Sequence, residues 1–297
     1  MGARDGVSAA GGRDRDGSQV DGSTGRAGSS RGPDMAVLSL SRSGRASANG
    51  CVLWSGPSRL DGQLVAVVAV GLLRASANRK TGDAIQTYII PTDMRPTEAV
   101  KVGRDASVCG GCQNRPALGG VCYVNLGHGP NGVWKCFDRG GYPSVDWDVW
   151  ATVAADRVGR LGTWGDPAAA PLDVWDRFTA PLDGWLGYTH QYRSPKLRDV
   201  LKYCQVSADS LGDAKAARAA GLGSFRVIGR NSPQLQPWEI RCPASEEAGK
   251  LATCESCLMC DGASGHNVAI NAHGPTRGRA VEGERRAPVF YDIQLGR

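Results

Sequence analysis

The sequence lacks any long run of apolar residues. The longest run, Leu64 to Val70, has the length of a β-strand, whereas a membrane-spanning helix needs about 20 apolar residues. The N-terminal segment also lacks an apolar stretch behind basic residues, which is the pattern of a secretory signal peptide. We therefore expect no membrane partner and a cytoplasmic location. In that compartment, clustered cysteines bind metal more often than they form disulfides.

Large apolar side chains are almost absent before Met35, where Gly, Ser, Arg and Asp dominate. A segment of this composition cannot bury enough surface to offset the entropy that is lost on ordering. We expect residues 1–50 to be a disordered tail, with Met35 as a candidate true start. The folded chain is expected to begin near Val52.

Positive charge is only mildly in excess, since the net charge is +6. The only dense basic patch lies in the C-terminal tail, residues 275–297, and consists of Arg277, Arg279, Arg285 and Arg286. Such runs are usually solvated surface, but they also contact nucleic acid. Nucleic acid is therefore a candidate partner, and the substrate stays unknown.

Two apolar stretches predict a β-hairpin within an N-terminal region that spans residues 51–146. Residues 64–71 form a continuous apolar run, and residues 84–90 alternate until Pro91 ends the strand. The linker between them is a polar turn, so the two strands are expected to pair directly. Its Lys80 lacks the preceding glycine spacing of a phosphate-binding loop, which excludes that class of nucleotide site.

From residue 147 onwards, short strands alternate with helices. We expect strands at 158–163, 184–188, 204–207, 224–228 and 267–270, and helices at 171–179, from Ser194 and from Ser210. Strands that alternate with helices pair in parallel through right-handed crossovers. The sequence therefore predicts an α/β protein with a partial parallel (βα) barrel-like domain over residues 147–274 and with cysteine-rich metal-binding loops.

Polar side chains follow these strands, at the edge where the sites of parallel sheets lie. Asp166 follows the first strand, Thr189 and His190 the second, Asp209 the third and His273 the last. We predict Asp166, His190, Asp209 and His273 as catalytic residues, with Asp166 and Thr189 also binding a cofactor. Because any loop contains polar residues, this prediction depends on the side chains converging on one face.

Seven of the ten cysteines fall into two tight sets. The first set is Cys109-x2-Cys112-x9-Cys122, and Cys136 is a candidate fourth thiolate. Four thiolates suit a closed structural zinc site, whereas three suit an iron–sulfur cluster with one open iron. The spacing thus predicts a metal centre here and leaves zinc and iron–sulfur open.

The second set is Cys242-x11-Cys254-x2-Cys257-x2-Cys260, so three of its thiolates lie on one short loop. Repeated two-residue spacing is typical of cubane clusters, in which one loop wraps several corners. A zinc site more often uses two separate Cys-x2-Cys pairs. We predict a [4Fe-4S] cluster at this second set, with zinc as the alternative.

Several motifs together resemble a family of proteins from phages and their bacterial hosts. They are Asp105-Ala-Ser-Val-Cys-Gly-Gly-Cys112, Cys122-Tyr-Val-Asn125, Arg160-Leu-Gly-Thr-Trp-Gly-Asp-Pro167, Gly187-Tyr-Thr-His-Gln191, the late cysteine set and Ala272-His-Gly274. More distantly, the chain is similar to the phage gene-product-88 family, which has a Cys-Tyr pair near its start and a late cysteine cluster. Both families look radical-SAM-like, which implies a partial (βα) barrel.

The resemblance implies an iron–sulfur enzyme in which Cys109, Cys112 and Cys122 hold a cluster that binds S-adenosylmethionine, with Tyr123 beside it. It implies the host cytoplasm as the location, and it implies no particular reaction. The spacing departs from the usual radical-SAM signature, which has three and two residues between its cysteines; here the numbers are two and nine. The alternative is a zinc-stabilised accessory protein that binds nucleic acid without catalysis.

Overall fold

The computed structural model describes residues 36–76, 78–120, 122–229 and 235–272. Ordered structure begins earlier than the composition predicts, because Leu38 and Ala46 are already buried in the core. The amide of Leu38 donates a hydrogen bond of 2.8 Å to the carbonyl of Ser144. A few apolar side chains in a polar segment can therefore attach it to the core when a partner strand or loop is present.

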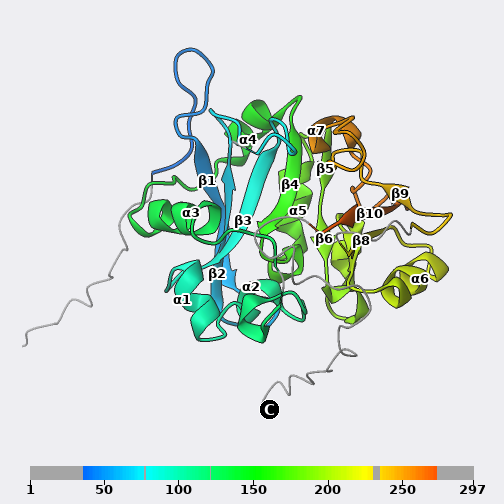
Figure 1. Ribbon diagram of the computed structural model, residues 1–297. Helices are drawn as coiled ribbons and strands as arrows, with labels where there is room; N and C mark the ends of the chain where they lie inside the picture. The colour runs from blue at the N-terminus through cyan, green and yellow to red at the C-terminus, as the bar shows by residue number, and fades with distance from the viewer. Residues whose placement is uncertain (1–35, 77, 121, 230–234, 273–297) are drawn as a thin grey trace, which may run out of the picture. The chain divides into compact units, whose positions relative to one another are not determined.

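The first sheet combines an antiparallel meander with parallel strands (Figure 1). Its strands, in spatial order, are β1 (Gly50–Pro57), β2 (Leu64–Val70), β3 (Ile85–Pro91), β4 (Val158–Trp164) and β5 (Gly184–Leu186). The β2–β3 pair is antiparallel, which confirms the predicted hairpin, and β4 and β5 add in parallel. Every position of β3 is buried, so both faces of this sheet are covered.

The second sheet also has five strands, and every pair of neighbouring strands in it is parallel. Its spatial order is β6 (Tyr188–Thr189), β7 (Gln205–Ala208), β8 (Ser224–Ile228), β10 (Asn267–Asn271) and β9 (Ile240–Arg241). The strand predicted at 184–188 is split at Gly187, so that β5 pairs in the first sheet and β6 in the second. A Cβ atom at Gly187 would meet the sulfur of Cys204 at 2.8 Å, which explains why glycine stands at this crossing.

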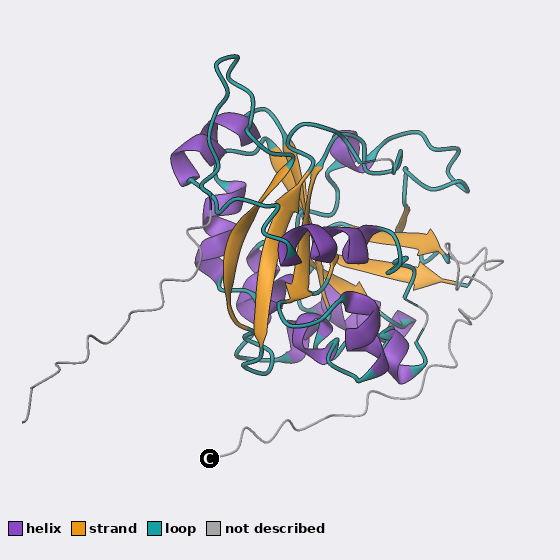
Figure 2. Ribbon diagram, turned by 90° about the vertical axis from the view of Figure 1, so that its left-hand side faces the viewer, coloured by secondary structure: helices purple, strands orange, loops and turns teal. Residues whose placement is uncertain are grey.

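Helices pack on the strands from both sides (Figure 2). The α-helices are α1 (Pro96–Lys101), α2 (Ala106–Cys109), α3 (Gly129–Asp138), α4 (Trp147–Ala154), α5 (Leu172–Thr179), α6 (Leu211–Ala219) and α7 (Cys254–Cys257). Short 3-10 helices are η1 (Pro116–Leu118), η2 (Pro167–Ala169), η3 (Gln191–Arg193) and η4 (Arg198–Lys202). The first three α-helices contact β3, α5 contacts β1, and α6 contacts β7 and β8.

Aromatic side chains close the core around α4 and α5. Trp150 stacks on Phe178 with ring centroids 5.1 Å apart, and Trp175 meets the same ring edge-on. Both indole N–H groups donate to backbone carbonyls, Trp150 to Phe178 and Trp175 to Pro167. Buried indoles need such acceptors because an unpaired N–H in a core is costly.

The parallel pairing of the βα region is confirmed, but one predicted helix is wrong. The segment from Ser194 follows η3, which ends at Arg193, and forms only the 3-10 helix η4 in place of an α-helix. Only Val200 is buried within η4, so the segment has no apolar stripe that tertiary packing could hold as an α-helix. Among the described residues, no helix is long and apolar enough to cross a membrane.

Candidate functional site

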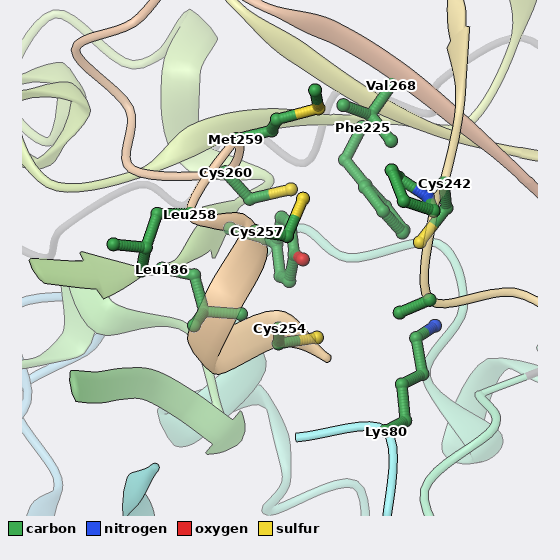
Figure 3. A pocket seen from close by; sticks show the side chains of 13 residues that line it. Lys80, Leu186, Phe225, Cys242, Cys254, Cys257, Leu258, Met259, Cys260 and Val268 are labelled. Atoms are coloured by element: carbon green, nitrogen blue, oxygen red, sulfur yellow. The ribbon is translucent and has the colours of Figure 1, made fainter. Parts of the chain in front are cut away.

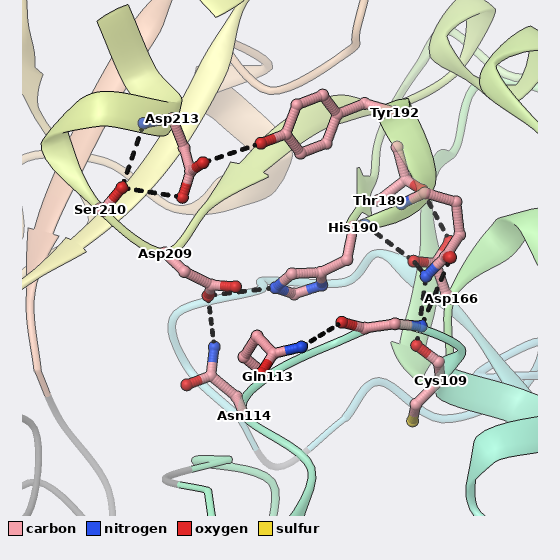
Figure 4. A network of polar contacts seen from close by, with 12 residues as sticks. Cys109, Gln113, Asn114, Asp166, Thr189, His190, Tyr192, Asp209, Ser210 and Asp213 are labelled. Atoms are coloured by element: carbon pink, nitrogen blue, oxygen red, sulfur yellow. Dashed lines mark hydrogen bonds and ion pairs between the residues drawn. The ribbon is translucent and has the colours of Figure 1, made fainter. Parts of the chain in front are cut away.

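Asp166 is the central acceptor at the carboxyl end of β4. Its Oδ1 accepts hydrogen bonds from the amide of Ala168 and the hydroxyl of Thr189, at 3.0 and 2.8 Å. Its Oδ2 accepts from the amide of His190 and from Nε2 of Gln191, at 2.8 and 3.2 Å (Figure 4). Asp166 is 5% exposed, so these four donors hold a buried carboxylate in place.

His190 stands beyond this carboxylate and points toward the next strand end. Its Nε2 lies 3.2 Å from Oδ1 of Asp209, which also accepts from Nδ2 of Asn114 at 2.7 Å (Figure 4). Burial lowers the pKa of His190, but the neighbouring Cys112 and Asp209 outweigh burial and raise this pKa well above its usual value. The imidazole thus lies between the carboxylate of Asp209, directly after β7, and Cys112 of the first set.

The cysteines of the first set influence one another electrostatically. Burial raises the pKa of Cys109 well above its usual value, and Cys112 and Cys122 raise it further. The pKa of Cys122 is raised to about 11, mainly by burial, with Cys112 adding to the rise. The amide of Asp166 donates to the carbonyl of Val108 at 2.6 Å, which places α2 and Cys109 next to the end of β4.

An ion pair and a glutamine fix the loop that carries this set. Arg115 donates from Nη2 to Oδ1 of Asp105 at 2.7 Å and from Nη1 to the carbonyl of Gly110 at 3.2 Å. Gln191 donates to the carbonyl of Cys109 at 3.3 Å. The loop is therefore tied to its own helix at one end and to the strand-end network at the other.

Gly110→Ala is expected to disturb this loop more than Gly103→Ala. Both glycines have positive φ, +54° and +74°, but a Cβ at Gly110 would lie 2.6 Å from Nε2 of Gln191, while a Cβ at Gly103 meets nothing within 4 Å. The backbone strain common to both variants costs about 1 kcal/mol, and Gly110→Ala also displaces Gln191. Urea unfolding measures the difference in unfolding free energy, and equal losses for the two variants would contradict the contact.

Cys136 does not belong to the first set. It lies on α3, where a Cβ at Gly141 would meet its sulfur at 2.7 Å. Its thiol is hydrogen-bonded to Tyr142, and burial, with Cys136 adding to it, raises the pKa of Tyr142. Cys136 is absent from the groups that act on Cys109 or Cys122. The fourth thiolate that the sequence left open is therefore engaged elsewhere.

The second set surrounds a cavity that is lined by residues of both sheets and of α7. Cys242, Cys254, Cys257 and Cys260 line an empty volume of about 370 Å³, part of it open to solvent, and their sulfur atoms lie around a common space (Figure 3). Short backbone hydrogen bonds hold the cysteine loop: the amide of Cys254 donates to the carbonyl of Lys80 at 2.7 Å, and Gly187 donates to Cys260 at 3.0 Å. The hairpin linker and the strand crossing thus position this set.

The charges around the second set are positive. Burial raises the pKa of Cys254, while the nearby Arg160 and Lys80 lower it. Burial also raises the pKa of Cys260 to about 12, although a hydrogen bond from Tyr188 opposes the rise. No carboxylate is among the residues that line this cavity. Burial thus favours the neutral thiols, and Arg160 and Lys80 are the two cations that would stabilise a thiolate of Cys254.

Four of the strand-end residues predicted from the sequence lie together: Asp166, Thr189, His190 and Asp209. His273 lies outside the described residues, as do the basic residues of the C-terminal tail. Among the residues that the structure describes, no three His, Cys, Asp or Glu side chains are grouped to hold one metal ion. The metal-binding role of the cysteine loops thus stays a prediction.

Sequence reasoning missed several residues that shape the two sites. Gln191 and Arg115 fix the first loop, and Arg160, Lys80 and Tyr188 face the second set. A signal was present for Arg160, because a charged residue in the middle of the apolar stretch 158–164 is unusual for a buried strand. The other four residues carry no local signal.

Comparison of the chain with family models, curated proteins and solved structures gave no match in any of the three.

Proposed function

We propose that this chain is an iron–sulfur protein of the radical-SAM-like kind found in phage-related families. Cys109, Cys112 and Cys122 would hold one [4Fe-4S] cluster, and the second cysteine set would hold another. The observation that carries the proposal is the position of the first set beside the strand-end network of Asp166 and His190. In parallel sheets this edge is where substrates and cofactors bind.

The separation of Cys136 from the first set supports an open cluster. With three cysteines at the site and the fourth against Tyr142, a cubane would have one iron without a thiolate. That open position suits a small cofactor such as S-adenosylmethionine, with Thr189 and Tyr123 as nearby polar groups. The crossing of one strand from the first sheet to the second at Gly187 supports a partial (βα) barrel around this edge.

The second set fits a cluster in its donors and its spacing. Four thiols, three of them from residues 254–260, line one cavity with Lys80 and with no carboxylate. A single zinc ion needs all its sulfur atoms within about 2.3 Å of one point. A cubane takes each thiolate on a different iron, so its cysteines stand farther apart.

The chain's own residues would bind the clusters, orient the substrate and exclude water. When bound, clusters of this kind supply one-electron chemistry. Asp166 would fix α2 of the first set relative to β6, because its amide donates to the carbonyl of Val108 and its carboxylate accepts from Thr189 and His190. His190 would hold a proton between its Nε2 and Asp209. It lies at the same strand-end edge and would exchange this proton with a substrate.

Anaerobic purification with iron, sulfide and zinc analysis tests the proposal. We expect iron and sulfide for two clusters per chain, and we expect Cys112→Ser and Cys257→Ser each to remove one cluster. Cys136→Ser is the matched control, because its thiol contacts Tyr142, and it should keep both. S-adenosylmethionine should perturb the spectrum of the reduced wild-type protein and of Cys136→Ser, but not that of Cys112→Ser. A colourless protein without iron would refute the proposal.

A second candidate rests on the contact between His190 and Cys112. The imidazole is hydrogen-bonded to this thiol, so Cys109, Cys112, Cys122 and His190 form a Cys3His donor set that suits structural zinc. The protein would then be a zinc-stabilised accessory protein that binds nucleic acid without catalysis. Zinc in place of iron, lost on both Cys112→Ser and His190→Ala, would support this alternative.

A further inference from the structure

Arg160 is a buried cation in the middle of the first sheet. It lies on β4 and is 8% exposed. Its Nη2 donates a hydrogen bond of 3.0 Å to the hydroxyl of Tyr123. Its Nε is buried and has no hydrogen-bond partner among the described residues. A guanidinium in this state is costly unless a negative group compensates it.

The groups that act on Arg160 are neutral in the metal-free chain. Burial lowers the pKa of its guanidinium, and Tyr123, Tyr188 and Cys254 outweigh burial and raise it, with a smaller contribution from Tyr88. In the part of the chain that the structure describes, no carboxylate forms an ion pair with Arg160. Among the groups that raise the pKa of Arg160, the thiol of Cys254 is the one that becomes a lasting anion once it is a metal ligand.

The same guanidinium reaches both cysteine sets. On one side it holds Tyr123, the residue directly after Cys122 in the first set. On the other side Arg160 is the register partner of Leu186 on β5, which lines the cavity of the second set together with Tyr188 and Cys254, and its charge lowers the pKa of Cys254. One side chain of β4 therefore lies between residues 122–123 and the loop 254–260.

We propose that Arg160 is a positioning residue shared by the two metal sites, which compensates the thiolate charge of the second set and fixes the first set through Tyr123. This inference rests on the proposed metal sites. Arg160 would be one buried cation that stabilises two negative metal centres, so that neither site is independent of the other. Outer groups of this kind change metal affinity about 10–100-fold when they are removed.

The test compares Arg160→Met with Arg59→Met in the full-length, metal-loaded protein. Arg59 is the control because its guanidinium is partly buried and donates to Asp199 at 2.7 Å and to the carbonyl of Lys196, with no cysteine among these partners. Metal release to a chelator gives one phase for each site, and Cys112→Ser and Cys257→Ser assign the phases. We expect Arg160→Met to speed release about tenfold at both sites and Arg59→Met at neither.

A second readout is the reduction potential of each cluster. Loss of the positive charge disfavours the added electron, so the potentials should shift to more negative values in Arg160→Met. If this variant does not fold, Tyr123→Phe tests the link to the first site, because it removes the hydroxyl that accepts from Arg160. Tyr123→Phe should affect the first site alone.

The outcomes separate this inference from the proposed function. Two metal centres in the wild-type chain, with release and potentials unchanged in Arg160→Met or changed at one site only, would overturn the shared role of Arg160 alone. The same holds if Tyr123→Phe leaves the first site unaffected. A wild-type chain that binds no metal would overturn both the proposed function and this inference.

Discussion

Asp166→Ala is expected to lower the unfolding free energy by about 4 kcal/mol, because several buried donors lose their acceptor at once. The carboxylate accepts from two backbone amides and from the side chains of Thr189 and Gln191. Urea unfolding of the purified protein measures this loss. Metal content at the first cysteine set should fall as well, because Gln191 then no longer holds the carbonyl of Cys109.

Asp146→Ala is the matched control for this prediction. Asp146 also accepts from two backbone amides, those of Asp148 and Val149, but it caps α4 at the surface. Loss of such a cap costs about 1 kcal/mol. Asp166→Asn keeps one acceptor oxygen and should fall between the two variants. If Asp166→Ala were no more costly than Asp146→Ala, the carboxylate would not be the centre of the strand-end network.

Glu239→Ala is expected to destabilise the protein by about 3–5 kcal/mol, since it breaks a buried ion pair with Arg226. The two side chains form a bidentate pair, with distances of 2.7 Å from Nε to Oε1 and 2.6 Å from Nη2 to Oε2, and both are almost fully buried. Glu239 precedes β9 and Cys242. The variant should therefore also lower metal content at the second set.

The pair of Glu98 and Lys101 provides the control for Glu239. These side chains are exposed and lie 3.1 Å apart, and exposed pairs contribute at most about 1 kcal/mol. Glu98→Ala should therefore change the unfolding free energy little. The double variant Arg226→Met/Glu239→Leu should recover most of the stability, because it removes both charges. A double variant as unstable as Glu239→Ala would show that the cost does not come from breaking this ion pair.

Local patterns in the sequence predicted much of the βα region. Apolar runs and cap residues define a strand and its following helix within about ten positions, and the structure places β4, α5, β7, α6 and β8 at or near the predicted ranges. The same patterns failed where packing decides. Ser194 and Pro195 form an acceptable helix start, but the segment after them has little apolar surface to bury.

The strand-end residues were predictable because chain order and parallel pairing bring them to one edge. Asp166, His190 and Asp209 each follow a strand directly, and parallel strands end on the same side of a sheet. Gln191 follows the same strand end, but Asn114 reaches the network from a position that local spacing does not mark. A hydrogen bond between residues 95 positions apart leaves no periodic trace in the sequence.

The sequence by itself determined most strands other than β1 and β9, the parallel pairing of the βα region and the grouping of seven cysteines into two sets. Each of these depends on side-chain periodicity or spacing over a few residues. Only the tertiary structure decided that Cys136 contacts Tyr142 away from the first set, that Gly187 divides one strand between two sheets, and that Arg160 lies between the two sets. These features depend on contacts between segments far apart in the chain. Burial and charge compensation select such contacts only after the whole core has assembled.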